Sequence, residues 1–177
     1  MLTVMGIDQS LTSTGVCIVT EFLDPESVWV HDILHTCTIP TSKTDEPSWL
    51  IDTATRAEII VTKLNELIGE YRPDVVVFEA LSLGSTGSAT RTLPVLMGYI
   101  LALLNAEKIY TVPPSTLKKF ATGKGNAKKE AMYGALTEEH TAMFSIANTY
   151  LKTKGRYDVV DAYWLTQYML GTLYAKD

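Results

Sequence analysis

The chain has 177 residues, of which 46% are hydrophobic and 20% are charged, and its formal net charge is −5. These values suit one globular domain with a full hydrophobic core, argue against disorder, and lower the expectation of a nucleic-acid partner. The start lacks the regions of a secretory signal, the longest apolar run, Val95–Leu104, is about half of a membrane span, and Cys17 and Cys37 are too few for a disulfide framework. We therefore expect a protein of the cytoplasm without a membrane anchor.

The first residues predict a β-meander. Residues 2–7 form a buried apolar run that ends at Asp8, and a Ser/Thr/Gly turn follows it. Residues 15–20 are rich in β-branched side chains, and residues 28–39 alternate loosely between apolar and polar. We expect three strands here, the third of them antiparallel.

Helices and strands alternate in the remaining sequence. We expect strands at 74–78 and 109–112, and helices at 49–67, 93–106, 115–121, 127–136 and 157–173, with Asn126 as the N-cap of the fourth. A strand, helix, strand order favours parallel pairing through right-handed crossovers. The sequence therefore predicts one α/β domain with a mixed sheet over residues 1–177.

Two of these strands end on a carboxylate. Asp8 follows the first apolar run, and Glu79 follows the β-branched run at 74–78. Ligands of open α/β sheets lie beyond the carboxyl ends of the strands, so the two acids converge if their strands are neighbours. The alternative is that each acid only ends a strand and faces water.

A second pair of acids, Asp158 and Asp161, opens the last predicted helix. Their spacing of three residues places both side chains on one helix face, roughly 5–6 Å apart at Cβ. The positive end of the helix explains one aspartate in the first turn, but a second like charge close by favours a cation between them. Tyr163, Trp164 and their apolar neighbours are expected to anchor this helix in a core.

Four carboxylates from two strand ends and one helix start have the chemistry to hold two hard divalent cations. Mg²⁺ prefers such oxygens, and two ions about 3.5–4 Å apart stabilise an in-line phosphoryl displacement. The three histidines are scattered and are expected to be structural or exposed. The Gly84–Ser88 loop lacks the Gly-Lys-Ser/Thr ending of a P-loop, so it is only a weak phosphate-binding signal.

Charge is unevenly spread along the chain. Residues 1–107 hold 5 bases and 14 acids, whereas residues 108–177 hold 10 bases and 6 acids. The bases of the second part form two groups, Lys118, Lys119, Lys124, Lys128 and Lys129, and then Lys152, Lys154 and Arg156. This asymmetry indicates an anionic partner, although lysines on solvated helix faces give the same pattern.

Taken together, four segments resemble the RuvC-type Holliday junction resolvases. They are residues 6–15 (GIDQSLTSTG), the strand ending at Glu79, residues 123–130 (GKGNAKKE) and residues 158–162 (DVVDA), in that order and spacing. The resemblance covers almost the whole chain. It implies a ribonuclease-H-like fold with a mixed five-stranded sheet flanked by helices, a homodimer, and Mg²⁺-dependent nicking of symmetric strands at four-way DNA junctions.

The resemblance also implies roles for single residues. Asp8, Glu79, Asp158 and Asp161 would be the catalytic carboxylates and the ligands of two Mg²⁺ ions, with Mn²⁺ as a substitute. Lys118 and Lys129 would contact DNA phosphates, within the wider DNA-binding group that includes Lys119, Lys124 and Lys128. The small, divergent chain is similar to bacteriophage-encoded members, which would place it in a bacterial host cytoplasm.

Some residues depart from the family pattern. Gln9 stands where many members have proline, and the residues after Glu79 lack the aromatic side chain that many members insert at the junction centre, a role left to Leu81 or Leu83. Tyr163, Trp164 and Gln167 replace smaller residues in the last helix. The helix at 93–104 serves equally well as a dimer face or as part of the core.

Three other functions remain open from sequence. The first is a ribonuclease-H-like nuclease that cuts flaps, three-way branches or RNA–DNA hybrids. The second is a relative that binds branched DNA without cutting it, although all four carboxylates are present. The third is a fragment of an actin-like ATPase, whose first strand and turn are similar but which needs two such domains.

Overall fold

A computed structural model describes residues 1–26, 28–81, 89–146 and 157–174. Its five strands form one sheet in the order β3-β2-β1-β4-β5. They are β1 (Leu2–Asp8), β2 (Ser13–Leu23), β3 (Trp29–Pro40), β4 (Val75–Glu79) and β5 (Ile109–Val112). The meander β1–β3 is antiparallel, and β4 pairs in parallel with both β1 and β5, so the predicted mixed sheet is confirmed.

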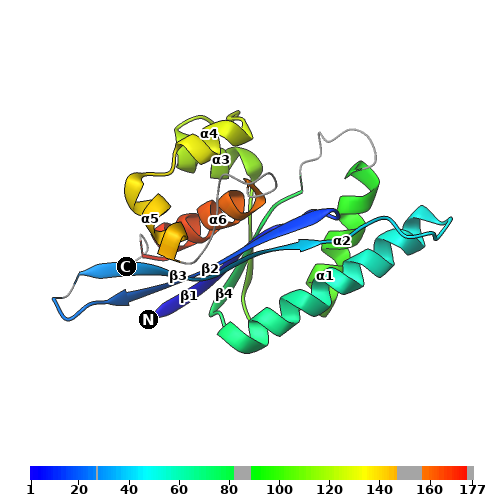
Figure 1. Cartoon of the computed structure of the whole chain (residues 1–177), viewed down its shortest axis with the longest axis horizontal. Helices are drawn as coiled ribbons and strands as arrows, with labels where there is room; N and C mark the ends of the chain where they lie inside the picture. The colour runs from blue at the N-terminus through cyan, green and yellow to red at the C-terminus, as the bar shows by residue number, and fades with distance from the viewer. Residues whose placement is uncertain (27, 82–88, 147–156, 175–177) are drawn as a thin grey trace.

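Helices cover both faces of this sheet (Figure 1). On one face lie α1 (Trp49–Tyr71) and α2 (Ala89–Leu103). On the other lie α3 (Pro114–Thr122), α4 (Lys129–Gly134), α5 (Glu138–Ile146) and α6 (Tyr157–Tyr174). Strands buried on both faces read as continuous apolar runs, which explains why the β1 and β4 sequences show no polar alternation.

The alternation of side chains along each strand builds two separate cores. Met5 and Ile7 of β1 point into the α1/α2 core, together with Leu64 of α1. Val4 of β1 points into the α6 core, together with Tyr163 of α6. All five side chains are completely buried, so the sheet is anchored on both sides.

Two glycines let α6 approach the sheet more closely than any other side chain allows. A Cβ built on Gly6 would lie 2.1 Å from the carbonyl oxygen of Ala162, and one built on Gly15 would lie 2.2 Å from that of Asp158. Both contacts are with backbone atoms, which cannot rotate away. Gly6 and Gly15 therefore allow α6 to pack directly against the backbones of β1 and β2.

Most predicted elements are present, with corrections at the ends of helices. The fourth helix begins at Lys129 rather than at residue 127, and Lys128, not Asn126, occupies its N-cap position without a side-chain bond. The helix predicted at 93–106 runs from Ala89 to Leu103. The predicted start was too late because the polar first turn shows no helical spacing of apolar residues. Helix α5 was not predicted, since its sequence has little helical amphipathicity. Among the described residues, no helix is both long enough and apolar enough to cross a membrane.

Candidate active site

The fold brings the four predicted carboxylates to one edge of the sheet. β1 and β4 are parallel neighbours, with Ile7 opposite Phe78, so Asp8 and Glu79 follow at matching positions. Because side chains alternate along a strand, Asp8 points to the same face as Val4, and Glu79 to the same face as Val77. This is the face that α6 covers. Because Gly15 contacts the backbone of Asp158, the start of α6 lies directly over this strand end.

The ammonium group of Lys129 lies among three of these carboxylates. Its Nζ is 3.0 Å from Asp158 Oδ1, 3.7 Å from Asp161 Oδ2 and 3.9 Å from Asp8 Oδ2. Lys129 is the first residue of α4, and more than half of its side chain is exposed, whereas the aspartates are largely buried. One lysine thus bridges β1 and α6 by electrostatic attraction.

Lys129 does not fully neutralise the negative charge of the carboxylates, as their pKa values indicate. Burial, and then the nearby Asp161, raise the pKa of Asp8 well above its ordinary value. Burial and Asp161 also raise the pKa of Glu79, although Lys118 and Lys129 oppose the shift. Burial raises the pKa of Asp161 to about 6, with Asp158 adding to the effect and Lys129 opposing it. Burial lowers the pKa of Lys129, but its attraction to Asp8 and the other aspartates outweighs this and raises it.

This donor set fits hard divalent cations. The oxygens come from carboxylates alone, which Mg²⁺ and Mn²⁺ favour, and their raised pKa values mark a site that an added positive charge would stabilise. Within the ranges that the structure describes, no three carboxylate, imidazole or thiol groups are close enough to share one ion as the side chains stand. The ammonium of Lys129 instead occupies the space between the aspartates.

Gln9 is a functional neighbour that sequence reasoning noted only as a departure from the family. Its side-chain nitrogen donates to the backbone carbonyl of Glu79 at 2.5 Å, which ties the ends of β1 and β4 together. A proline at this position has no such donor. The signal available in the sequence was an amide side chain directly after Asp8, the predicted catalytic residue.

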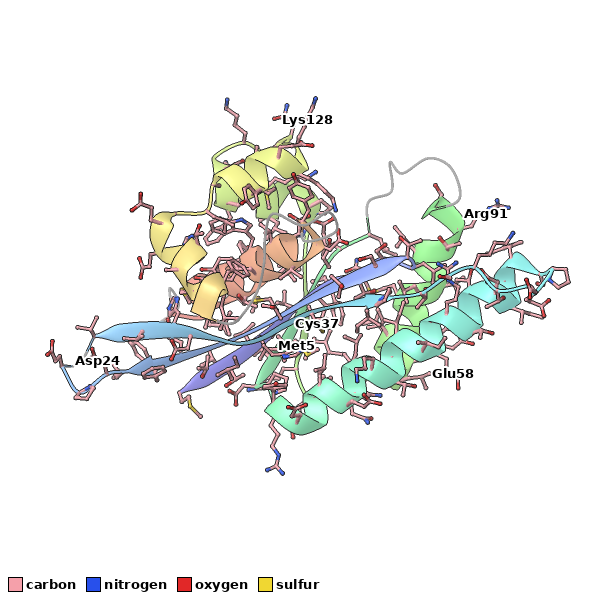
Figure 2. All side chains as sticks on the ribbon, viewed as in Figure 1. Met5, Asp24, Cys37, Glu58, Arg91 and Lys128 are labelled. Atoms are coloured by element: carbon pink, nitrogen blue, oxygen red, sulfur yellow. The ribbon has the colours of Figure 1, made fainter. Side chains whose placement is uncertain are left out.

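The predicted basic residues divide into two sets. Lys118, on α3, is half-buried and near enough to lower the pKa of Glu79, and Lys129 contacts the aspartates directly. No contact within the described residues joins the exposed Lys119, Lys124 and Lys128 to the carboxylates. Lys119 lies on α3, and Lys124 and Lys128 lie in the segment between α3 and α4; Figure 2 shows Lys128 on the outer side of that layer.

Several predictions fall on residues that the structure does not describe. They concern the basic group Lys152, Lys154 and Arg156, the Gly84–Ser88 loop, and Leu83 as a side chain that opens the junction. Leu81 is described, and it packs against the α1/α2 core.

The three histidines lie in structural settings. His31 pairs with Glu21 across the β2–β3 hairpin, His35 stacks on Tyr71, and His140 packs against Tyr163 and Trp164. Among the described residues, none of the three contacts a carboxylate of the site. Tyr163 and Trp164 are core residues of α6, as predicted.

A sheet of this order, with acids at the ends of two adjacent parallel strands and at the start of a covering helix, defines a ribonuclease-H-like fold with a carboxylate site. The structure of Thermus thermophilus RuvC superposes with a TM-score of 0.65 and 18% identity, covering 97% of this chain and 96% of that one. The same protein in complex with a Holliday junction substrate gives a TM-score of 0.62. These likenesses confirm the predicted fold.

Sequence relatives define the family. A crossover junction endodeoxyribonuclease RuvC from Rickettsia prowazekii is 30% identical over 129 residues, which cover 72% of this chain and 75% of the relative. Its counterpart from Chlorobium phaeovibrioides is 35% identical over 79 residues, 44% of this chain and 42% of that protein's length. No family model matches the chain. The chain belongs to the RuvC family, as the motifs predicted; the likeness to bacteriophage members stays a prediction, since both of these relatives are bacterial.

Proposed function

We propose that residues 1–177 form one nuclease domain that nicks four-way DNA junctions by metal-dependent hydrolysis of phosphodiester bonds. The observation that carries this proposal is the gathering of Asp8, Asp158 and Asp161 around Lys129 in a RuvC-family chain. Together with Glu79, these acids come from three separate elements, two of them strands, and lie close together in spite of their mutual repulsion. Such an arrangement is typical of sites that act on phosphates through bound cations.

Asp8, Glu79, Asp158 and Asp161 are the proposed ligands of two Mg²⁺ ions, or of Mn²⁺. When bound, these ions supply Lewis acidity that lowers the pKa of a water molecule and stabilises the attacking and leaving oxygens. The chain itself supplies position: Gln9 holds the ends of β1 and β4 together, and Gly15 holds α6 against the sheet. Lys118 and Lys129 offset the negative charge of the reacting phosphate.

The proposed substrate is branched DNA, in line with the Thermus protein, whose complex contains a Holliday junction substrate. The exposed lysines of the α3–α4 layer would hold the phosphate backbone, so binding should weaken steeply as salt is added. A bacterial cytoplasm is the proposed location.

A homodimer is the proposed assembly, because two symmetric cuts need two active sites. Helix α2 offers the face. Its Leu96, Met97 and Ile100 are buried in the core, whereas Leu101 and Leu103 are 52% and 50% exposed. In this proposal the buried side of α2 belongs to the core and its exposed side forms the dimer face. Leu103→Glu should give a monomer in analytical ultracentrifugation, whereas Glu58→Gln on the exposed face of α1 should not.

The test is a nicking assay on labelled four-way, three-way, flap and linear substrates, with Mg²⁺ or with EDTA. We expect paired symmetric nicks on the four-way junction that require Mg²⁺ and disappear in Asp8→Asn. The matched control is Asp32→Asn, which removes an exposed carboxylate from the edge strand β3 and should leave nicking unchanged.

Two of the alternative functions have their own outcomes in this assay. Preferential cutting of flaps, three-way branches or hybrids would assign the chain to another branched or hybrid substrate. Binding without cutting by the wild type would make it a non-catalytic relative. Undiminished nicking by Asp8→Asn would contradict the carboxylate site itself.

A further inference from the structure

A hollow of about 490 Å³ lies beside the loop that follows β1. Its walls come from that loop (residues 9–12), from the first turns of α1 and from the start of α2. We call it the Trp49 hollow, after the indole that lines it together with Gln9, Lys43 and Leu93. Its volume is that of pockets that hold small organic molecules. The carboxylate site does not use it.

The indole of Trp49 is exposed in spite of its size. It is 46% exposed, and the guanidinium carbon of Arg91 lies 5.3 Å from the ring centroid. Arg91 extends from the start of α2, where Figure 2 labels it, so the pair joins the beginnings of two helices. A guanidinium over an indole forms a cationic stacking surface. Such a surface suits a planar aromatic ring that has a negatively charged group attached to it.

Positive charge is concentrated at this hollow. Residues 1–107 contain only 5 bases, and three of them, Lys43, Arg56 and Arg91, line the hollow or contact its indole. The Asp52 carboxylate also lines it, but it accepts hydrogen bonds from Thr44 and from Arg56. Asp52 and Arg56 therefore compensate each other, and Lys43 and Arg91 leave the hollow a net positive charge that favours an anion.

The Trp49 hollow is connected to the carboxylate site through a short, fixed loop. Gln9 lines the hollow, directly follows Asp8, and donates its side-chain amide to the carbonyl of Glu79. Its Oε1 atom is buried and has no hydrogen-bond partner in the part of the chain that the structure describes. Two residues on, the carbonyl of Leu11 accepts a bond from Arg56 at 2.9 Å. A ligand in the hollow would thus lie next to the strand ends that carry Asp8 and Glu79.

We propose that the Trp49 hollow binds one unpaired nucleotide of the DNA strand beside the bond that is cut. The base stacks on the surface formed by Trp49 and Arg91, and its phosphate pairs with Lys43 and Arg91. This inference rests on the proposed nuclease function and adds a specificity determinant to it. A linear duplex keeps its bases paired and stacked, whereas a branch point can release one, so the hollow favours branched DNA.

The direct test measures binding to a single-stranded oligothymidylate of about 12 nucleotides, by fluorescence anisotropy in EDTA. Trp49→Ala should weaken binding about tenfold, whereas Trp49→Phe, which keeps an aromatic face, should stay within about threefold of the wild type. Trp29→Ala is the matched control because Trp29 is 48% exposed at the far end of the β2–β3 hairpin. It should bind like the wild type.

Two further measurements guard against a variant that fails to fold. In Trp29→Phe protein, the remaining exposed tryptophan is Trp49, so oligothymidylate should quench the intrinsic fluorescence, and this quenching should be lost in Trp49→Phe. Arg91→Ala should also weaken binding and lower the salt slope by about one phosphate contact, whereas Lys108→Ala, an exposed base before β5, should not.

Equal affinity of Trp49→Ala and the wild type for the oligonucleotide overturns the inference, as does a Trp49→Phe protein that is as weak as Trp49→Ala. Absence of quenching in Trp29→Phe overturns it as well. Failure of the nuclease function has a different signature. A wild type that binds oligothymidylate through Trp49 but cuts no four-way junction would retain the nucleotide site and lose the proposed activity.

Discussion

The two faces of the sheet are built in different ways. The α1/α2 face is packed with large apolar side chains such as Leu64 and Phe78, which keep the helices at ordinary distance. The α6 face instead carries Gly6 and Gly15 at its closest contacts, so that helix and strand backbones touch. The α1/α2 face stabilises the fold through buried apolar area. On the α6 face, the two glycines let the helix lie close to the strands, which positions Asp158 and Asp161.

This difference follows from the alternation of β-strands. In β1, the alternation that points Val4 and Gly6 toward α6 also points Asp8 toward it. In β4, Glu79 points to the same face as Val75 and Val77. The proposed catalytic acids of β1 and β4 therefore both lie on the α6 face. Changes on the α6 face should consequently lower activity as well as stability, whereas changes on the α1/α2 face should lower stability alone.

The largest effect is expected from Gly15→Ala. The added Cβ would lie 2.2 Å from a backbone oxygen of Asp158, so α6 must move away from the sheet and take two carboxylates with it. We expect the free energy of unfolding to fall by about 3 kcal/mol and nicking by about 100-fold. Urea denaturation and the junction assay measure the two effects.

The control is Gly69→Ala on α1, where an added Cβ meets nothing within 4 Å. It should stabilise the helix by about 0.5–1 kcal/mol and leave nicking unchanged. A Gly15→Ala protein with normal stability and activity would show that close approach of α6 is not required.

The second prediction concerns the other face. Leu64→Ala removes a completely buried side chain from the α1/α2 core and should lower the free energy of unfolding by about 3 kcal/mol. Nicking at a temperature where the variant is folded should be unchanged, because the four carboxylates lie on the other face of the sheet. Ile59→Ala, at a position 52% exposed on the same helix, should change stability by less than about 0.5 kcal/mol. A selective loss of nicking in Leu64→Ala would erase the distinction between the faces.

The third prediction uses the charge of the α6 face. The pKa of Asp161 is about 6 in the folded protein against an ordinary 3.8, so the folded state binds more protons than the unfolded state between these values. Stability in EDTA should therefore fall as the pH rises from about 4 to about 6, and stay low above that. Asp161→Asn should be more stable than the wild type at pH 7 by about 2–3 kcal/mol, with a flatter pH profile.

Thermal denaturation across this pH range provides the measurement, with Asp32→Asn as the control. A wild type that gains stability between pH 4 and pH 6 while Asp161→Asn does not would reverse the sign and refute the assignment. Activity should rise over the same interval, since the acids must be ionised to hold a cation.

The smallest effect is expected at Lys129. Its ammonium and a divalent cation compete for the same aspartates, so Lys129→Met should bind Mn²⁺ about tenfold more tightly, equivalent to roughly 1.4 kcal/mol. Isothermal titration calorimetry measures the affinity without reference to nicking. The neighbouring Lys128→Met, at an exposed position away from the acids, should bind Mn²⁺ like the wild type. Weaker binding by Lys129→Met would mean that this lysine supports the metal site instead of competing with it.

Local patterns were enough to predict much of the fold and part of the site. Strands that end on Asp8 and Glu79, and a helix that begins with Asp158 and Asp161, follow from periodicity over a few residues. Helix α5 and the start of α4 were not found, because short polar helices depend on the surfaces they cover more than on their own pattern.

The sequence by itself determined which residue types were available and on which side of each strand they fall, because side-chain alternation and helical spacing are local properties. Only the tertiary structure placed Lys129 between the aspartates, Gln9 against Glu79, and Arg91 over Trp49. Each of these contacts joins segments that are far apart in the chain. The distances in these contacts depend on how closely α1, α2 and α6 pack on the sheet. That packing depends on all the buried side chains together.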